Sequence, residues 1–588
     1  MKSFGKLKSA VALMMAASMV LLTACNGGGT SSAPASDAGG SQSETASSAA
    51  PADSSDAGEE SQSGGGLEGV SFDTSNLNEL GTTPVLKETV KLTVGRNTDT
   101  NIIDMDTNTY TKMLEENVNL DLEFVYFPAN TDERKQKLSV MISSGGELPD
   151  AIIFDLTDLQ TYTWGSQGYF LPLNEYLDNV SVYMKPLLDE YEDVYGKYYY
   201  SPDGNMYAPP RIVEDLGNDW SHRMWINQTW LDNLDMEMPT TTDEYYEVLK
   251  AFKEQDPNGN GKADEIPLMG SKDGWNTLLY PALLGAFTYV NWDYDCLQLN
   301  DGKLNAAYTT DGWRDGLEYL NKLCSEGLLS PLTYTQDNNQ FKQILENADD
   351  QLIGGMTAGS MSIYQMESER KKDMASMAPL TGPEGICYSS YLMAGLPGQY
   401  GFVTKDCKDP LAAFMMFDYM YKEEMVYQGR FGTKDVNWFD PEPGDTSLFA
   451  SAGYEPKLRV PNPIWGTMQN EFWGENHPTF RKNEAICGQV DLGNPYDYTY
   501  MTANAVPNYM GKVPAETVQK ILYTQEEADS IADIKATLET HRKENAVAFI
   551  TGNRPISDWD NYVAEVESIG LAQYLEVSQQ AYDRMMAS

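Results

Sequence analysis

The sequence predicts an α/β protein built from more than one lobe, on three observations. Strand and helix signals alternate over residues 90–154, well-capped amphipathic helices follow, and the 588-residue chain is too long for a single core. Alternation of this kind predicts parallel strands covered by helices on both faces. We therefore expect mixed or parallel sheets flanked by helices.

The first folded stretch has the order strand, helix, strand, helix, strand. The strand signals are VKLTVGR (90–96), LDLEFVYF (120–127) and DAIIF (150–154), and residues 107–117 and 132–143 carry helical signals between them. Ligands of open parallel sheets bind beyond the carboxyl ends of the strands. Topology alone therefore points to Arg96, Asn97, Phe127 and Asp155 as neighbours of a binding site.

Later helices are marked by their end signals. Thr241 and Glu244 form a capping-box pattern that predicts a helix over 242–254. Pro410, with Asp409 as its cap, starts another helix that we expect to end just before Gly429. Residues 516–586 are helical by pattern, except for a break at 549–562.

The first residues have the features of a bacterial export signal. Three lysines precede a mostly apolar stretch over 10–22, and Leu22-Thr23-Ala24-Cys25 resembles a lipobox. A membrane-spanning helix needs roughly 20 apolar residues, so this stretch is too short to span. We expect a lipoprotein signal peptide at 1–24 and a lipid on Cys25, which would place the mature protein on the outer face of the cell membrane.

Residues 25–84 follow as the lipidated cysteine and a tether rich in Gly, Ser and Ala. Such a composition cannot bury enough apolar surface to fold, so we expect this stretch to be disordered and the folded body, 85–588, to begin after it. The formal net charge of −46 argues against nucleic-acid binding. At long range it also disfavours an anionic ligand, although Arg211 and Arg223 could reverse this within a Debye length of about 8 Å.

Residues 256–267, DPNGNGKADEIP, resemble half of a calcium-binding loop. Oxygen-bearing side chains alternate at the first, third and fifth positions, a glycine follows at the sixth, and the seventh can offer its backbone carbonyl. Pro267 stands where an EF-hand has its closing Glu, so no second helix is expected and the site would be static. The alternative is a pair of Asn-Gly turns on an acidic surface. The candidate ligands are Asp256, Asn258, Asn260, Lys262, Asp264 and Glu265.

Enzyme signatures are largely absent from the sequence. It contains no HExxH, GxSxG or Walker phosphate loop, and its three histidines are far apart. The cysteines after Cys25 are odd in number and lack a CxxC pair, which indicates neither a zinc site nor a complete disulfide framework. A glycosidase could still draw a carboxylate pair from 87 acidic residues. We expect no catalysis.

Aromatic side chains in polar loops are candidates for sugar stacking. Any single Trp is more often part of a core, but five are flanked by Gly, Asn, Asp or Pro, which is typical of loops. These five are Trp220, Trp275, Trp292, Trp465 and Trp473.

From about residue 90 to the C-terminus the chain resembles the family 1 extracellular solute-binding lipoproteins of bacterial ABC-type sugar importers. The stretches that carry the resemblance include LPDAIIF, GYFLPLNEYL, PDGNMYAPP, the long segment from WINQTWL to DEIPL, and the end from FITGNRP to QAYDR. It is similar in particular to the large Firmicutes subgroup with a calcium loop, related to alginate-oligosaccharide-binding proteins.

This resemblance implies a periplasmic-binding-protein-like fold of type II, with ligand held in a cleft between two lobes. Chain crossings are expected near 210–222, 390–400 and 445–465. One lobe would comprise about 85–210 and 400–445, and the other about 211–399 and 446–588. The six loop residues would hold a structural Ca²⁺. Ligand contacts implied by location are Tyr207, Arg211, Trp220, Arg223, Ser360 and Trp465.

The sequence therefore predicts a monomeric, lipid-anchored binding protein of a Gram-positive bacterium. It would capture a carbohydrate, most simply an oligosaccharide, and deliver it to the permease of an ABC transporter. ATP would be hydrolysed on another chain, because no phosphate loop exists here. Alternatives left open are a binding protein for peptides or another small solute, a ligand-sensing partner of a signalling complex and, last, a surface glycosidase.

Overall fold

The computed structural model describes residues 70–347 and 350–587. The expected signal peptide, Cys25 and most of the expected tether lie outside this part of the chain. Residues 70–84 had been assigned to the tether, but they pack on the body: Leu77 is buried and bridges to Leu86, and the Ser71 backbone N–H donates to Glu175 at 2.6 Å. The folded body therefore begins near residue 70, because Leu77 supplies an apolar anchor within a polar stretch.

The first lobe is built on a four-stranded sheet with the order β12-β3-β1-β2. Its strands are β1 Val90–Asn97, β2 Leu120–Phe127, β3 Ala151–Ile153 and β12 Phe402–Val403. The first three are parallel, as the alternating strand and helix signals predict, and only β12 is antiparallel. The first connecting helix is shorter than expected: α1, Thr109–Leu114, passes into a π-helical turn at Glu115–Asn119.

The second lobe is built on a sheet with the order β10-β5-β9-β6. Its strands are β5 Met224–Asn227, β6 Ile266–Leu268, β9 Ile353–Thr357 and β10 Met374–Met377. β6 is parallel to β9, whereas β5 is antiparallel to both β9 and β10. The carboxyl ends of β6, β9 and β10 and the start of β5 therefore share one edge of the sheet.

A three-stranded sheet, β11-β4-β13, lies where the chain passes between the two lobes. β4 is Pro210–Val213, β11 is Gly398–Gln399 and β13 is Thr479–Arg481. The first two crossings agree with the expected ranges. The third was expected near 445–465 but is made by β13, because residues 472–480 still pack in the first core.

Two large hydrophobic clusters correspond to the two lobes. One gathers the helices and strands around β5, β6 and the C-terminal helices, and the other surrounds β1, β2 and helix α13, Pro410–Met420. Trp473 is fully buried in the second of these clusters, beside Tyr110 and Phe124. Residues 464–480 thus belong to the first lobe, contrary to the expected boundary, whereas residues 448–454 pack with Trp220 and Tyr509 in a separate cluster.

The capped helices form largely where the sequence predicts them. α9, Thr242–Glu254, has the complete capping box of Thr241 and Glu244. The helix expected from Pro410 to about residue 428 is interrupted after Met420, where Lys422 is extended, and continues as α14, Glu423–Phe431. Gly429 therefore lies inside a helix instead of after it.

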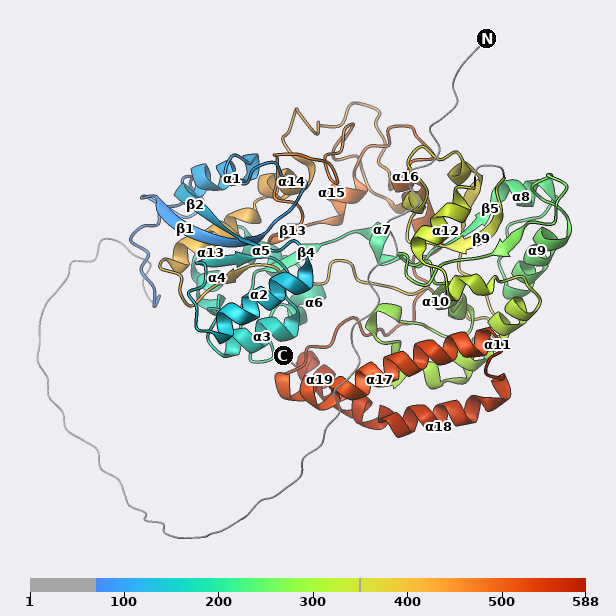
Figure 1. The fold of residues 1–588 in the computed structure, drawn as a ribbon. Coiled ribbons are helices and arrows are strands. Elements are labelled where there is room, and N and C mark those ends of the chain that lie inside the picture. Colours follow the sequence, from blue (N-terminus) through green and yellow to red (C-terminus); the bar gives the residue numbers. More distant parts are fainter. Residues whose placement is uncertain (1–69, 348–349, 588) are drawn as a thin grey trace, which may run out of the picture. The chain divides into compact units, whose positions relative to one another are not determined.

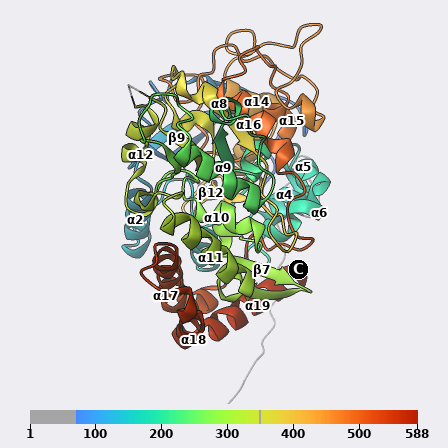
Figure 2. The ribbon, with the colours of Figure 1, turned by 90° about the vertical axis from the view of Figure 1, so that its right-hand side faces the viewer.

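The C-terminal region forms three helices that pack beside α11, Asp311–Ser325, and the hairpin of β7, Leu297–Asn300, and β8, Lys303–Ala306 (Figures 1 and 2). They are α17 Gln525–Ile550, α18 Trp559–Ile569 and α19 Leu571–Ala587. The break expected at 549–562 is present but shorter, and residues 516–524 are not helical.

The remaining elements are short. The hairpin strands are β7 Leu297–Asn300 and β8 Lys303–Ala306, and the other helices are α2 Thr131–Ser143, α3 Asp158–Ser166, α4 Asn174–Val180, α5 Met184–Glu190, α6 Glu192–Tyr195, α7 Leu216–Asp219, α8 Gln228–Asn233, α10 Tyr280–Leu283, α12 Asn338–Leu345, α15 Asn483–Cys487 and α16 Tyr498–Ala505. No helix of the described residues is both long and apolar enough to cross a membrane.

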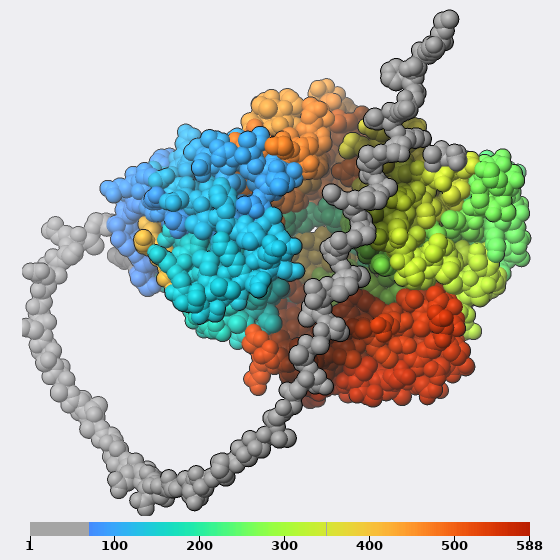
Figure 3. Space-filling view, in the orientation of Figure 1, coloured from blue at the N-terminus to red at the C-terminus, as the bar shows by residue number. Residues whose placement is uncertain are grey.

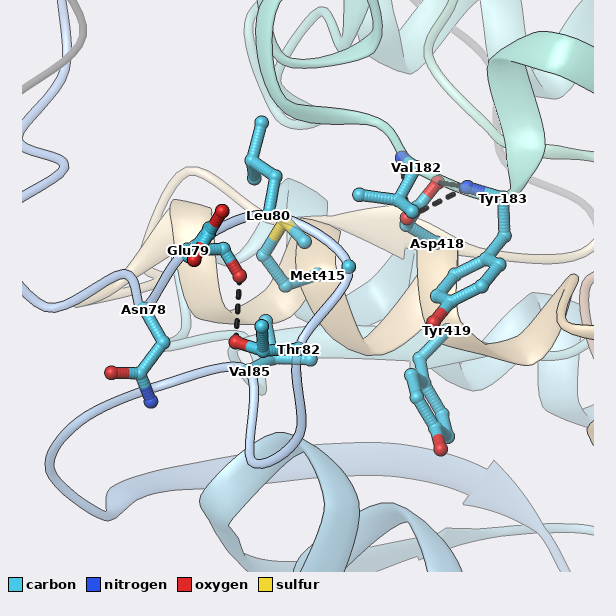
Figure 4. A pocket seen from close by; sticks show the side chains of 11 residues that line it. Asn78, Glu79, Leu80, Thr82, Val85, Val182, Tyr183, Met415, Asp418 and Tyr419 are labelled. Atoms are coloured by element: carbon cyan, nitrogen blue, oxygen red, sulfur yellow. Dashed lines mark hydrogen bonds between the residues drawn. The ribbon is translucent and has the colours of Figure 1, made fainter.

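A buried carboxylate anchors the first lobe near its start. Asp418 on α13 lies beside a small pocket under the loop 78–85 (Figure 4). It accepts hydrogen bonds from the Ser181 hydroxyl at 2.5 Å and from the backbone N–H groups of Val182 and Met184, both at 2.9 Å. Tyr183 N–H completes the set at 3.2 Å. The carboxylate thus satisfies donors at the start of α5 that have no partner within that helix.

Replacing Asp418 by Ala is expected to lower the free energy of unfolding by about 3 kcal/mol, because several buried donors lose their acceptor together. Urea unfolding followed by circular dichroism measures this change. Asp178→Ala is the matched control: Asp178 is largely exposed and only 3.8 Å from Lys185, so its loss should cost less than about 1 kcal/mol. Equal effects of the two substitutions would contradict the assigned role.

Candidate functional site

The strand ends of both lobes face the crossing sheet, and charged and aromatic side chains gather there. In the first lobe, the carboxyl end of β3 pairs with the segment that leads out of β11, through the bridge between Leu156 and Gln399. In the second, β5 begins directly after the first crossing. Figure 3 shows the surface hollowed between the first-lobe residues, in blue and cyan, and second-lobe residues in yellow-green.

Glu475 is the centre of a cluster of three arginines from different segments. Arg211 of β4 donates to its carboxylate at 3.2 Å, Arg481 of β13 at 3.3 Å, and Arg430 of α14 at shorter range. Arg211 also donates through Nε to the Glu475 carbonyl at 2.7 Å. We call these four residues the arginine cluster. Burial alone would raise the pKa of the Glu475 carboxyl, but the surrounding guanidinium groups lower it to about 2.

Two half-buried aromatic rings flank the arginine cluster. The Arg211 guanidinium lies 5.0 Å from the ring centre of Tyr400, and that of Arg430 lies 4.3 Å from the ring centre of Trp465. The side chains of Arg211 and Arg430 remain 18% and 21% exposed, so both can be reached from solvent. The cluster therefore offers stacking surfaces next to fixed hydrogen-bond donors.

A second charged group lies at the carboxyl end of β3. Asp155 is paired with Arg134, and with Lys135 at 3.1 Å. The Tyr400 hydroxyl is influenced by charges of this group and of the arginine cluster, although burial is the main cause that raises its pKa. Tyr400 therefore lies between the two charged groups.

The second lobe contributes an exposed tryptophan on a rigid support. Trp275 is 53% exposed, and its carbonyl accepts the Gly359 N–H at 3.0 Å. A Cβ added at Gly359 would come within 2.4 Å of the indole ring, so the ring packs directly on this backbone. Arg223 is fully buried beneath and donates to the carbonyls of Gly359 and Gly217. Arg223 thus supports the backbone under Trp275, and burial removes it from reach of a ligand.

Trp220 and Asp219 lie on the first crossing. Trp220 is almost fully buried and packs at 4.9 Å against Tyr391 of the second crossing. Asp219 accepts the Ala394 N–H at 2.8 Å, and burial raises the pKa of its carboxyl to about 7. These contacts join two of the crossing segments to each other.

Other residues expected at the site occupy the interior. Arg96 donates to the carbonyls of Ile153, Asn476 and Trp473, and the Trp473 indole donates to Thr111 at 2.7 Å. Both Arg96 and Trp473 are buried, with no surface left for a ligand.

Three further expected contacts are also used within the protein. The Tyr207 hydroxyl donates to Asp203 at 2.7 Å, and Ser360 accepts the Ser362 N–H at 3.0 Å. Trp292 packs against Tyr280 at 5.3 Å, in the second-lobe core.

Sequence reasoning missed Glu475, Arg430, Arg481 and Tyr400. They come from three separate segments, near residues 400, 430 and 475–481, that only the tertiary fold brings together. The one local signal is the stretch WGENHP, in which Glu475 lies between Trp473 and His477.

The loop that follows α9 is folded by hydrogen bonds from its backbone to its own side chains. The Asp256 carboxylate accepts the backbone N–H groups of Asn260 at 3.1 Å and Gly261 at 3.0 Å, and Asn260 Oδ1 accepts Lys262 N–H at 2.7 Å. Pro267 lies in β6, so the loop leads into a strand and no second helix follows.

Two observations at this loop fit a bound cation. One Glu265 oxygen, Oε1, is buried without a hydrogen-bond partner. Burial, with Asp256 and Asp264 adding to it, raises the pKa of this carboxyl. Asp350, from a distant segment, accepts from the Asn260 amide at 3.1 Å and adds a carboxylate that the sequence pattern did not reveal. Within residues 70–347 and 350–587, no three His, Cys, Asp or Glu side chains form a metal site by themselves, so Asn258 and Asn260 would be required as well.

His477, next to the arginine cluster, provides a test of this environment. Its ring is buried against Tyr110 at 5.1 Å, and burial, together with the positive charges of Arg96 and Arg211, lowers its pKa from 6.5 to about 4. Below about pH 6.5 the His477 ring is therefore protonated in the unfolded chain but stays neutral in the folded chain. The free energy of unfolding that His477 contributes is lost as the pH falls from 6.5 to 4.

We expect His477→Gln to reduce this pH dependence by up to roughly 3 kcal/mol between pH 7 and pH 4. The measurement is urea unfolding of both proteins at several pH values. The variant will have its own stability at pH 7, so only the difference in slope is informative. Parallel curves for the two proteins would show that His477 does not titrate as described.

The chain is similar to known binding proteins over most of its length. Residues 100–427 match the model of the bacterial extracellular solute-binding protein family. The fructooligosaccharide ABC transporter substrate-binding protein FusA of Streptococcus pneumoniae is 27% identical over 493 residues, which cover 81% of this chain and 86% of FusA.

Solved structures share the fold. FusA in complex with kestose has a TM-score of 0.65 at 24% identity and covers 84% of this chain and 99% of its own, and an EF-hand mutant of FusA has a TM-score of 0.64. An extracellular solute-binding protein of Bifidobacterium longum subsp. infantis has a TM-score of 0.71 at 20% identity, and the match covers 84% of this chain and 98% of that protein. The alginate-binding protein AlgQ2 without calcium ion has a TM-score of 0.58 at 20% identity, with 86% and 100% covered.

Proposed function

Because the chain belongs to the bacterial extracellular solute-binding protein family, we propose that it binds an oligosaccharide between its lobes and delivers it to an ABC transporter permease. The observation that carries this proposal is the arrangement at the crossing sheet. The arginine cluster, with Tyr400 and Trp465, is attached to β4 and β13 of the crossing sheet. The exposed Trp275 packs on Gly359, which Arg223 links to Gly217 of the first crossing segment.

These groups suit the chemistry of a sugar. A pyranose or furanose ring has an apolar C–H face that can lie on an aromatic ring, and hydroxyl groups that need fixed donors and acceptors. Trp275 offers the exposed ring, on a backbone that Gly359 and Arg223 hold in place. Arg211, Arg430 and Glu475 offer donors and an acceptor in fixed positions.

Ligand capture would work by closure of the lobes about the crossing strands. A ligand that touches both lobes favours the closed state by the difference between its affinities for the closed and open states. The closed form would then dock on the permease. FusA is described as the substrate-binding protein of a fructooligosaccharide ABC transporter, which supports transport without catalysis in this chain as well.

The expected lipid anchor belongs to the same proposal. Residues 1–24 and Cys25 lie outside the described residues, and the sequence pattern alone supports export and lipidation there. We propose a monomer attached to the outer face of the membrane, close to its permease.

We also propose that the loop 256–265 binds Ca²⁺ as a structural ion. Asp256, Asn258, Asn260, Asp264 and Glu265 with the Lys262 carbonyl would hold it, and Asp350 lies close enough to contribute. The ion would neutralise carboxylates gathered at the end of α9. The structures of an EF-hand mutant of FusA and of AlgQ2 without calcium support such a site in related proteins.

Oligosaccharide binding is tested by calorimetry with a panel of di- to pentasaccharides, followed by Trp275→Ala with the best ligand. We expect affinity to fall by about tenfold or more, because the variant loses its exposed stacking surface. Tyr496→Ala is the control. Tyr496 is exposed and lies against Lys372, which precedes the first residue of β10, away from the crossing strands. Binding of peptides but no saccharide would overturn the proposal.

Removal of calcium with EDTA is expected to lower the melting temperature and to leave sugar affinity nearly unchanged. At free calcium about a hundredfold above its Kd, the ion would add about 2.7 kcal/mol to the free energy of unfolding. Glu265→Gln should remove most of the calcium response, whereas Asp301→Asn, in the β7–β8 turn, should retain it. A melting temperature indifferent to calcium would rule out the site.

A further inference from the structure

The arginine cluster carries more positive charge than its own carboxylate neutralises. Three guanidinium groups surround one carboxylate, Glu475. The Nε atoms of Arg430 and Arg481 are buried and have no hydrogen-bond partner among the described residues. Buried donors without acceptors are costly, and charged donors more so. The cluster is therefore short of acceptors, and specifically of negative ones.

The neighbouring charges do not correct this shortage. Asp155 already pairs with two cations, Arg134 and Lys135. Asp215 lies near Arg481 and Arg430, but its partly buried carboxylate already accepts from Asn218 at the start of α7, and desolvation raises its pKa. Within the cluster, three guanidinium groups thus stand against Glu475 and the nearby Asp215, in a chain whose net charge is −46. A local excess of positive charge in so acidic a protein favours a ligand that carries negative charge at this place.

The shape of the cluster indicates which anion it would suit. The two exposed guanidinium groups, Arg211 and Arg430, lie against the rings of Tyr400 and Trp465. A planar fork of N–H donors matches a carboxylate, and the ring beside it can carry the face of the sugar that bears that carboxylate. A bare small anion would use the donors and leave the aromatic surface empty.

We infer that the ligand is an acidic oligosaccharide, with uronic acid units whose carboxylates are bound by Arg430 and Arg211. This inference rests on the proposed oligosaccharide function and adds the charge of the ligand to it. It also separates this chain from FusA, whose structure contains kestose, a neutral sugar.

The test compares acidic probes with neutral ones of the same length and linkage. Tetragalacturonate and tetramannuronate are titrated into the purified protein by calorimetry, beside their carboxyl-reduced counterparts. At low ionic strength, where local charge is least screened, at least one acidic probe should bind about tenfold or more tightly than its reduced form.

Variants then assign this preference to the cluster. Arg430→Gln should weaken acidic binding by about tenfold and change binding of the reduced form by less than about threefold, while Arg430→Lys should fall between. Arg459→Gln is the control, because Arg459 pairs with Asp445 and Glu442 outside the cluster. Melting temperatures show whether each variant is folded. If Arg430→Gln does not fold, the comparison of acidic and reduced probes on the unmodified protein still tests the inference.

The outcomes separate this inference from the function on which it rests. Binding of the acidic probe with loss of preference in Arg430→Gln supports both. Equal or tighter binding of neutral saccharides overturns the acidic ligand and leaves the oligosaccharide function in place. An acidic preference that Arg430→Gln leaves unchanged overturns the role of the cluster. Failure of every saccharide, acidic or neutral, overturns both.

Discussion

The carboxylate of Glu475 is the interaction on which the crossing region depends. It ties β4, β13 and α14 together through Arg211, Arg481 and Arg430, and its pKa near 2 means that the charge persists at any physiological pH. The three segments are far apart in the sequence, and this carboxylate adds side-chain links to the backbone pairing of β13 with β4. Removing it would leave three buried or half-buried cations to repel one another, a costlier change than the loss of a surface ion pair.

The first sheet could be predicted because its signals are local. Strand and helix signals over 90–154 fix the order of elements, and the parallel arrangement follows from short connections that contain helices. The capping pair of Thr241 and Glu244 likewise acts within one turn of helix. Where the outcome depended on distant partners, as for the third crossing, residues 70–84 and the break at Lys422, local patterns gave the wrong boundary.

The candidate sites divide in the same way. The proposed calcium loop could be found in the sequence because nearly all its oxygen donors lie within ten residues. Asp350 comes from a distant segment, which no local pattern indicates. Solvent exposure determines which tryptophans can contact a ligand. Trp275 and Trp473 have similar polar neighbours in the sequence, yet Trp275 is 53% exposed and Trp473 is fully buried. A flanking glycine predicts a loop, but whether a loop side chain turns outward depends on what packs above it.

The position of Trp473 has a consequence for how the protein reaches its native state. The first core contains β1 near residue 90 and Trp473 nearly four hundred positions later, with most of the second lobe encoded in between. Neither lobe is a continuous stretch of chain, so no single cut yields one of them whole. During synthesis the first core lacks α13 until about residue 420, and it lacks the aromatic side chains of Phe472, Trp473 and Phe480 until β13 has been made. Contacts of such sequence separation form slowly.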